Sequence, residues 1–274
     1  MMVTGDEKDM AIIELNIPSA RGSQLNSLIV EGAAGGPLVM MIHGFKANRT
    51  EDGRFLQVAR ALAEDGVNSI MFSQAGCGES YEDFIDYTLD NSLSDMETCL
   101  AWMKEHYHTD DAHTGLIGYS MGGRLVSLFT ERHPEIRTLA LWAAASVLDT
   151  NDFLGNDSRI LRQEAAEKGW CSFYNAFDGQ TLRMNGILLD NLDQYDPLES
   201  LRKYRGAALV IHGSRDITVD KSASFAAYEA LKSAAHRKLF IIDEADHGFG
   251  AWENRPELSE KLTGETIQFF RDYL

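Results

Sequence analysis

Cysteine, proline and basic side chains are all scarce in this chain. Its 274 residues include three cysteines and five prolines. The cysteines are scattered and odd in number, which is typical neither of a disulfide framework nor of a zinc cluster. Lysine and arginine number 25 against 42 acidic residues, which gives a formal net charge of −17. This balance argues against nucleic acids and anionic membrane surfaces as partners.

Long apolar runs are also missing. No run approaches the length that crosses a bilayer. Residues 1–9 are polar and acidic, without the basic and apolar regions of a secretory signal. We therefore expect a cytoplasmic protein without a membrane segment. A hydrophobic content of 44% and a charged content of 24% suit one large globular α/β domain with room for an insertion.

Short apolar runs alternate with helical patterns along most of the chain. Strands are predicted at residues 12–17, 25–30, 37–42, 68–72, 116–117, 138–143, 207–211 and 238–242. Between them, apolar residues recur at helical spacing within residues 55–62, 93–103, 125–129, 225–231 and 267–274. This alternation predicts an α/β protein with a mostly parallel eight-stranded sheet flanked by helices.

One segment breaks the alternation. Residues 147–205 show no clear buried strand and mix acidic residues, glycines and aromatic residues. A connection of roughly sixty residues is too long for a plain loop. We expect an inserted cap subdomain, with residues 1–146 and 206–274 as the core. Because the insertion follows a strand, the cap is expected above the sheet edge where ligands bind; the alternative is an extra layer far from any site.

A glycine-rich turn supplies the first candidate for catalysis. Residues 118–122 read G-Y-S-M-G, after an apolar run and before a helical pattern. A sharp turn between strand and helix exposes a serine hydroxyl at its apex, which is the arrangement of a nucleophile elbow. The alternative interpretation of Ser120 is a serine that caps the helix.

A serine becomes a good nucleophile only when a base removes its proton and an acid orients that base. Asp216 and His247 each follow an apolar run downstream of Ser120, which places both on loops after strands. Asp220 is the second choice for the acid. His212 precedes the acid inside a predicted strand and is expected to be a core histidine or a support for the acid.

The chain resembles the α/β-hydrolase superfamily from about residue 25 to residue 274. The resemblance rests on H-G-F at residues 43–45, the serine turn, the acid loop and the histidine loop, in the family's order. It implies a serine hydrolase without a cofactor or metal, in which His43 braces a loop. The implied site residues are Ser120, Asp216 and His247 as the triad, and the backbone N–H groups of Phe45 and Met121 as the oxyanion hole.

Residues 43–49 and 246–249, together with a cap of this length, are most similar to the bacterial cinnamoyl and feruloyl esterases. In that group the cap helps to bind the acyl part of the ester. The resemblance implies a carboxylesterase that acts through an acyl-enzyme on small to medium esters, including hydroxycinnamoyl (feruloyl-type) esters. The aromatic side chains expected to contact substrate are Trp170, Tyr174, Phe177 and Phe249.

One motif departs from the family. Many relatives carry D-x-x-G-x-G-x-S after the second parallel strand, whereas residues 73–80 here read S-Q-A-G-C-G-E-S. Ser73 thus replaces an aspartate that is structural in such relatives. The change concerns the subfamily rather than the catalytic residues.

Other functions stay open at this point. Acids in the cap could hold a substrate's terminal amine, as in a serine aminopeptidase or amidase. Acylglycerol lipases and thioesterases share the fold, and a non-catalytic binding module is a further alternative. The histidine-rich residues 106–113 are expected to form a solvated connector rather than a metal site. The expected partner is a small-molecule ester, and the resemblance suggests a homodimer.

Overall fold

An eight-stranded sheet runs through the core of the protein. The computed structural model describes residues 11–109, 111–176 and 178–274. The strand order is β1-β2-β4-β3-β5-β6-β9-β10. The strands are β1 (Ile12–Pro18), β2 (Gln24–Val30), β3 (Leu38–Ile42), β4 (Asn68–Phe72), β5 (Thr114–Tyr119), β6 (Thr138–Trp142), β9 (Ala207–Gly213) and β10 (His236–Ile242). Only β1–β2 and β2–β4 pair antiparallel among them, so the predicted mostly parallel sheet is confirmed.

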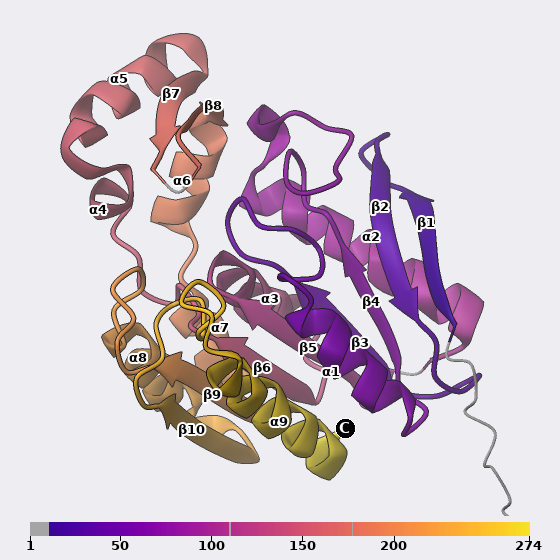
Figure 1. Ribbon diagram of the computed structural model, residues 1–274. Coiled ribbons are helices and arrows are strands. Elements are labelled where there is room, and N and C mark those ends of the chain that lie inside the picture. The colour runs from indigo at the N-terminus through magenta and orange to yellow at the C-terminus, as the bar shows by residue number, and fades with distance from the viewer. Residues whose placement is uncertain (1–10, 110, 177) are drawn as a thin grey trace, which may run out of the picture.

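Helices cover both faces of the sheet because its central strands are apolar on both sides. Every residue of β3, β4, β5, β6 and β9 is buried. Figure 1 shows two helices on one face, α1 (Arg54–Ala63) and α9 (Pro256–Tyr273). The other face carries α2 (Leu89–Tyr107), α3 (Met121–Arg132), α7 (Pro197–Lys203) and α8 (Ser222–Ala230). Short 3₁₀ turns lie at Phe84–Asp86, Asp111–His113, Gly155–Asp157 and Leu231–Ser233.

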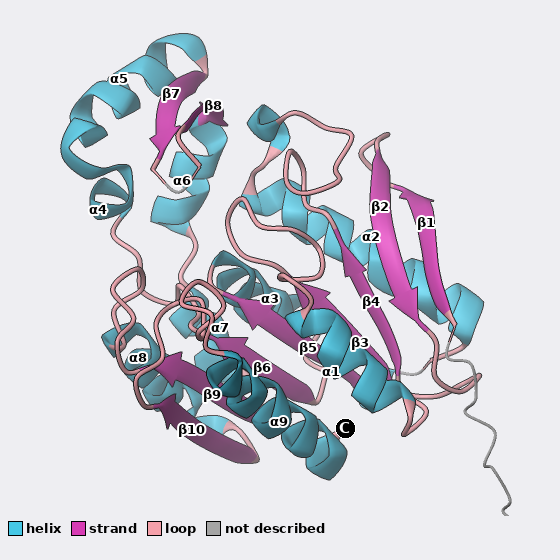
Figure 2. Cartoon of the chain, in the orientation of Figure 1, coloured by secondary structure: helices cyan, strands magenta, loops and turns pink. Residues whose placement is uncertain are grey.

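The long insertion folds beside this core as a lobe of its own. It contains α4 (Thr150–Leu154), α5 (Ser158–Lys168), β7 (Trp170–Asn175), β8 (Gln180–Asn185) and α6 (Gly186–Gln194). We call residues 150–194 the cap. β7 and β8 pair antiparallel as a separate two-stranded sheet. Figures 1 and 2 show the cap above the carboxyl ends of the central strands, joined to the core by two connections.

The hairpin in the cap could not be recognised as buried strands from the sequence. β7 and β8 each mix buried and exposed residues, and half of the residues of β8 are exposed. After the cap, α7 returns to the core and packs against α3. None of the helices among the described residues has both the length and the apolar content that crossing a membrane would require.

Candidate active site

The serine turn between β5 and α3 is held in a strained conformation. Ser120 has φ 54° and ψ −116°, a backbone conformation that L-residues rarely adopt. A Cβ at Gly122 would lie 2.0 Å from the carbonyl oxygen of Ile42, so only glycine fits there. The Ser120 side chain makes no capping hydrogen bond to α3, which argues against the alternative role as a helix cap.

Three side chains from separate loops form a continuous hydrogen-bonded chain. His247 Nε2 lies 3.0 Å from Ser120 Oγ, and His247 Nδ1 lies 2.7 Å from Asp216 Oδ2. His247 follows β10 and Asp216 follows β9, so each reaches the site from the carboxyl end of its strand. The histidine is 5% exposed, which limits the access of water to the proton that it shares with the serine. The arrangement predicted from the sequence is therefore brought together.

Asp216 is held as a carboxylate by its neighbours. Its Oδ1 accepts hydrogen bonds from the backbone N–H groups of Thr218 and Val219, at 2.8 and 2.9 Å. Burial disfavours its charge, but the hydrogen bonds from His212, His247 and the Val219 N–H outweigh burial and hold the pKa of the Asp216 carboxyl well below its usual range. An ionised Asp216 keeps the proton of His247 on Nδ1, so that Nε2 is free to accept the serine proton.

His212 supports this carboxylate from the other side. It is fully buried, and its Nε2 lies 3.1 Å from Asp216 Oδ2 and 2.9 Å from the carbonyl oxygen of Val219. Both neighbours are acceptors, so Nε2 carries the proton. Nδ1 lies 2.7 Å from the Ser224 hydroxyl, from which it accepts. The second-choice acid, Asp220, is instead exposed and accepts from the Ser222 N–H at the start of α8.

The loop after β3 approaches the serine closely. A Cβ at Gly44 would lie 3.3 Å from Ser120 Cβ, and Gly44, Phe45, Ser120 and Met121 line one cavity. Met121 begins α3, so its N–H is one of the donors that a helix leaves without an internal partner. Two backbone donors on either side of a serine hydroxyl are what an oxyanion hole requires.

His43 fixes the orientation of the Phe45 N–H. His43 Nε2 accepts from the Gln74 N–H at 3.0 Å, so the ring proton is on Nδ1, which donates to the Gly44 carbonyl at 2.8 Å. The C=O and N–H of a trans peptide point in opposite directions. The bond to Gly44 therefore turns the Phe45 N–H away from His43. Burial lowers the pKa of His43 to about 4, which keeps the ring in this neutral form.

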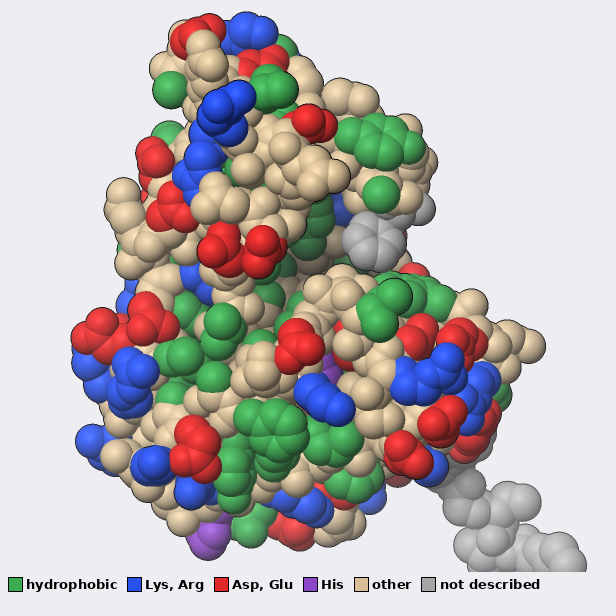
Figure 3. Space-filling view, turned by 90° about the vertical axis from the view of Figure 1, so that its left-hand side faces the viewer, with side chains coloured by type: hydrophobic (Ala, Val, Ile, Leu, Met, Phe, Trp, Pro, Cys, Tyr) green, Lys and Arg blue, Asp and Glu red, His purple; other side chains and the backbone are tan. Residues whose placement is uncertain are grey.

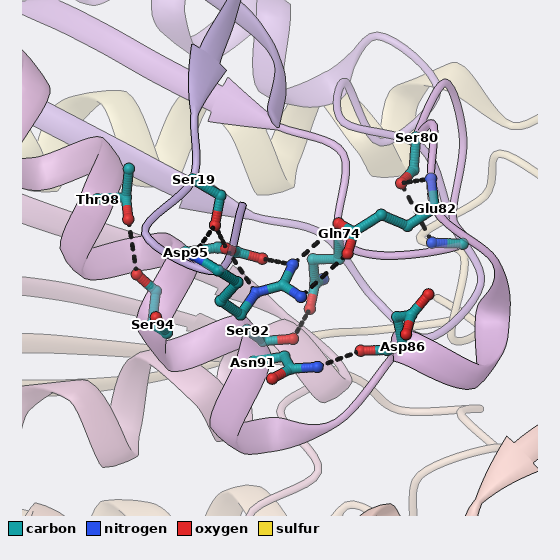
Figure 4. A network of polar contacts seen from close by, with 12 residues as sticks. Ser19, Gln74, Ser80, Glu82, Asp86, Asn91, Ser92, Ser94, Asp95 and Thr98 are labelled. Carbon is teal, nitrogen blue, oxygen red and sulfur yellow. Dashed lines mark hydrogen bonds and ion pairs between the residues drawn. The ribbon is translucent and has the colours of Figure 1, made fainter. Parts of the chain in front are cut away.

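A polar network behind this loop anchors it to α2. Gln74 donates from its side chain to the His43 carbonyl at 2.8 Å and accepts from the Ser92 hydroxyl at 3.1 Å. Figure 4 shows the Gln74–Ser92 contact beside a second cluster, in which Asp95 binds Ser19 and Arg21. The loop that carries the Phe45 N–H is thus fixed by groups outside the cavity.

The cavity over Ser120 has a volume of about 860 Å³ and is bounded on one side by the cap. In Figure 3 the surface is hollowed between the cap and the core. Phe45 packs edge-on against Phe153 of α4, with ring centroids 5.3 Å apart, and Phe153 stacks on Phe173 of β7 at 5.4 Å. Leu148 and Leu154 also line this wall.

The aromatic residues expected to contact substrate are distributed unequally. Tyr174 lines the cavity. Trp170 is not among the lining residues and lies under the cations of Lys168 and Arg183. Phe249 is fully buried and does not line the cavity either. Phe177 lies outside the described residues.

Sequence reasoning missed Phe153 and Phe173. Had β7 been recognised as a strand, its two-residue period would have placed Trp170 and Phe173 on opposite faces. No comparable signal marks Phe153, which follows three polar residues in the short helix α4.

The described residues contain no group of three or more His, Cys, Asp or Glu side chains arranged to hold a metal ion. In the histidine-rich segment, His106 stacks on Trp102 and its Nδ1 lies 2.8 Å from the Trp102 carbonyl. The three cysteines are buried and free.

Comparison with solved structures shows where this fold recurs. Est1E from Butyrivibrio proteoclasticus with bound ferulic acid superposes with a TM-score of 0.76, at 22% identity, over 94% of this chain and 99% of that one. GrgF, an alpha/beta hydrolase from Penicillium sp. sh18, gives a TM-score of 0.77 at 15% identity, over 96% and 99% of the two chains. A monoacylglycerol lipase from Paleococcus ferrophilus gives 0.69 at 16% identity, over 90% and 98%.

A comparison with curated protein sequences gave no match. The sequence pattern of the prolyl oligopeptidase family (Peptidase_S9) matches residues 57–274, which contain the serine turn, the acid loop and the histidine loop. The sheet order, the strained serine turn and the match over most of the chain agree with one another. The chain therefore belongs to the prolyl oligopeptidase family and is a serine hydrolase of the α/β-hydrolase fold.

Proposed function

We propose that this protein is a carboxylic ester hydrolase in which Ser120, His247 and Asp216 form the catalytic triad. The observation that carries the proposal is the hydrogen-bonded chain from Ser120 Oγ through His247 to Asp216, at 3.0 and 2.7 Å, opening onto a cavity with an apolar wall. A non-catalytic binding module would have no need for this alignment.

The reaction proceeds in two acyl transfers. Ser120 Oγ attacks the ester carbonyl carbon while His247 Nε2 takes the hydroxyl proton. The N–H groups of Phe45 and Met121 stabilise the oxyanion. The C–O bond to the alcohol then breaks, and His247 returns the proton to the departing oxygen. Water, activated by the same histidine, hydrolyses the acyl-enzyme and restores the Ser120 hydroxyl.

The shape of the cavity favours an ester with an apolar, medium-sized acyl group. We take residues 150–194 as the cap that closes the acyl side, where Phe45, Phe153 and Phe173 form an aromatic wall. A flat aryl-acyl group can pack against such rings. A second cavity of about 630 Å³ shares His247 and Trp252 with the first. Ser120 does not line this second cavity, so the reacting ester binds in the first.

A substrate panel tests this function. The purified protein is assayed with p-nitrophenyl esters of increasing acyl length and with methyl ferulate and methyl p-coumarate, with Ser120→Ala as the blank. We expect turnover that rises from acetyl to larger acyl groups and depends on Ser120. Turnover that is equal in the wild type and in Ser120→Ala would exclude the proposed nucleophile.

The family match supports a second candidate, an aminopeptidase or amidase. The carboxylates of Asp152 and Asp178 lie among the cavity-lining residues and could face a substrate's ammonium group. Aminoacyl-naphthylamides added to the same panel separate the two functions. Faster cleavage of these amides than of any ester would favour the peptidase, and no cleavage would dismiss it.

A further inference from the structure

A buried ion pair lies against the cavity and contacts three of the segments that form the site. Glu51 and Arg54 have side chains 2% and 5% exposed, and Glu51 Oε2 lies 3.1 Å from Arg54 Nη2. Both residues line the cavity over Ser120. Neither was singled out in the sequence, where charged residues just before a helix suggest a solvated surface. Enclosed charges of this kind need partners on every side.

Glu51 holds the loop that carries the Phe45 N–H. Its Oε1 accepts from the Gly44 N–H at 2.6 Å, one peptide before the Phe45 donor. Glu51, Asp52 and Gly53 have φ angles of 49°, 53° and 88°, so three consecutive residues adopt the left-handed conformation just before α1. Backbone strain of this kind persists where the surrounding contacts impose it, often at functional sites. Here the left-handed turn accompanies a Glu51 carboxylate that is buried and points toward the Gly44 N–H.

Arg54 reaches the other two segments. Its Nη1 donates to the carbonyl of Gly248 at 2.7 Å, directly after His247 in the chain. Its guanidinium lies 4.9 Å from the ring centroid of Tyr119, the residue before Ser120. The Tyr119 hydroxyl in turn donates to the His247 carbonyl at 3.0 Å. One guanidinium therefore contacts the neighbours of both the nucleophile and the base.

We propose that the Glu51–Arg54 pair is a positioning element that sets the oxyanion loop, the serine turn and the histidine loop at their working separations. The inference rests on the hydrolase function proposed above. Neither side chain exchanges a proton with the substrate; they act through Gly44, Tyr119 and Gly248. A guanidinium offers its donors in a fixed planar fork, so Lys cannot bind Glu51 and the Gly248 carbonyl in the same geometry.

A purely structural role is the competing explanation. Burial raises the pKa of Glu51 to about 7, against the opposing effect of Arg54, so the carboxylate is costly to keep charged at this position. What separates this pair from an ordinary buried ion pair is its contacts to Gly44 and Gly248. A matched pair serves as the control: Arg21 and Asp95 join the β1–β2 turn to α2, with Asp95 fully buried and Arg21 Nη2 2.7 Å from its Oδ2. That pair lines neither cavity described above.

The experiment compares Arg54→Lys, Glu51→Gln and Glu51→Ala with the control Asp95→Asn. Three quantities are measured: kcat and KM for a p-nitrophenyl ester, the second-order rate of labelling by an alkyl fluorophosphonate, and the melting temperature. We expect Arg54→Lys to lower kcat and the labelling rate by about 10- to 100-fold, with KM within about twofold. Glu51→Gln should retain more activity than Glu51→Ala, because an amide oxygen can still accept from Gly44.

The control defines the result that overturns the inference. Asp95→Asn is expected to lower the melting temperature while the rates per folded molecule stay unchanged. If Arg54→Lys and Glu51→Gln behave in the same way, the pair is structural only. A wild-type protein that the fluorophosphonate fails to label would instead contradict the proposed hydrolase function, so the two failures are distinguishable. Arg54→Lys and Glu51→Gln keep the size of the side chains and decide the question even if Glu51→Ala does not fold.

Discussion

His212 Nε2 lies 3.1 Å from Asp216 Oδ2, the same oxygen that contacts His247 Nδ1 at 2.7 Å. One carboxylate oxygen thus accepts a hydrogen bond from a fully buried histidine and another from the histidine proposed as the base. The hydrogen bond from His212 fixes the orientation of the Asp216 carboxylate. The carboxylate in turn fixes the orientation of the His247 ring. The acid of the site is therefore held by its own strand, β9, as well as by the loop that follows it.

Replacement of His212 tests this support. In His212→Phe, Asp216 loses one of the hydrogen bonds that stabilise its charged form, so its pKa should rise. We expect kcat/KM for an ester to fall about tenfold and the acidic limb of the pH–rate profile to move to higher pH. The control is Ser224→Ala, which removes only the partner of Nδ1. Equal profiles for His212→Phe and the wild type would show that His212 only fills the core.

Replacement of Asp216 distinguishes the two candidate acids. Asp216→Asn keeps the size of the side chain but no longer holds the His247 proton on Nδ1, and we expect kcat to fall about 10⁴-fold. Asp220→Asn should leave kcat unchanged, because Asp220 is exposed and contacts the start of α8. Steady-state kinetics of both variants make the comparison. The reverse pattern would reassign the acid to Asp220.

Phe153 tests the acyl wall. Its ring contacts Phe45 and Phe173, so Phe153→Ala removes the central ring of the three. We expect KM for methyl ferulate to rise by up to about tenfold, whereas p-nitrophenyl acetate, which is too small to reach the wall, is little affected. Phe225→Ala, on α8 and outside the cavity, is the matched control. Parallel losses on both substrates would argue against a role in acyl selection.

His43 gives a prediction about pH. In the unfolded chain His43 becomes protonated as the pH falls below its ordinary pKa of 6.5. In the folded protein burial lowers the pKa of His43 to about 4, so the ring stays neutral down to about that pH. The unfolded state therefore binds more protons between pH 6.5 and 4, and His43 makes stability fall as the pH falls through this window. In His43→Gln, which keeps a donor and an acceptor, this fall should be smaller by about 3 kcal/mol.

Urea unfolding at pH 4 to 7 checks the His43 prediction. Glu51 has a raised pKa, so over part of this range its titration makes the stability of the protein rise as the pH falls. Because Glu51 is present in both proteins, this effect is common to both curves. The difference between the two stability curves therefore isolates His43. Curves that run parallel from pH 6.5 to 4 would contradict the assignment of a neutral, buried His43.

The residues that were expected in one site from the sequence, and that the structure brings together, share a physical reason. Strands such as β3 and β9 are continuous apolar runs, and Ser120, Asp216 and His247 follow such runs directly. Parallel strands bring their carboxyl ends to one edge of the sheet. Residues that follow such strands can therefore be expected in one site from the sequence alone, even when they are distant in the chain.

The parts that sequence reasoning missed depend on contacts that no periodic pattern records. Glu51 and Arg54 look like ordinary charged residues, and only the strained turn before α1 buries them. His212 was expected as a core or supporting histidine, but its two acceptors could not be known from the strand that contains it. Phe153 lines the cavity from α4, the first helix of the cap, and the composition of the insertion does not specify this position.

The most direct test of the central claim is the hydrolysis of a p-nitrophenyl ester by Ser120→Ala, compared with the wild type at equal folded concentration. The hydroxyl of Ser120 lies 3.0 Å from His247 Nε2, and its removal leaves the base without a nucleophile to activate. We predict that kcat falls by at least about 10⁴-fold while the melting temperature stays close to that of the wild type. Turnover by Ser120→Ala within tenfold of the wild type would contradict the assignment of Ser120 as the nucleophile.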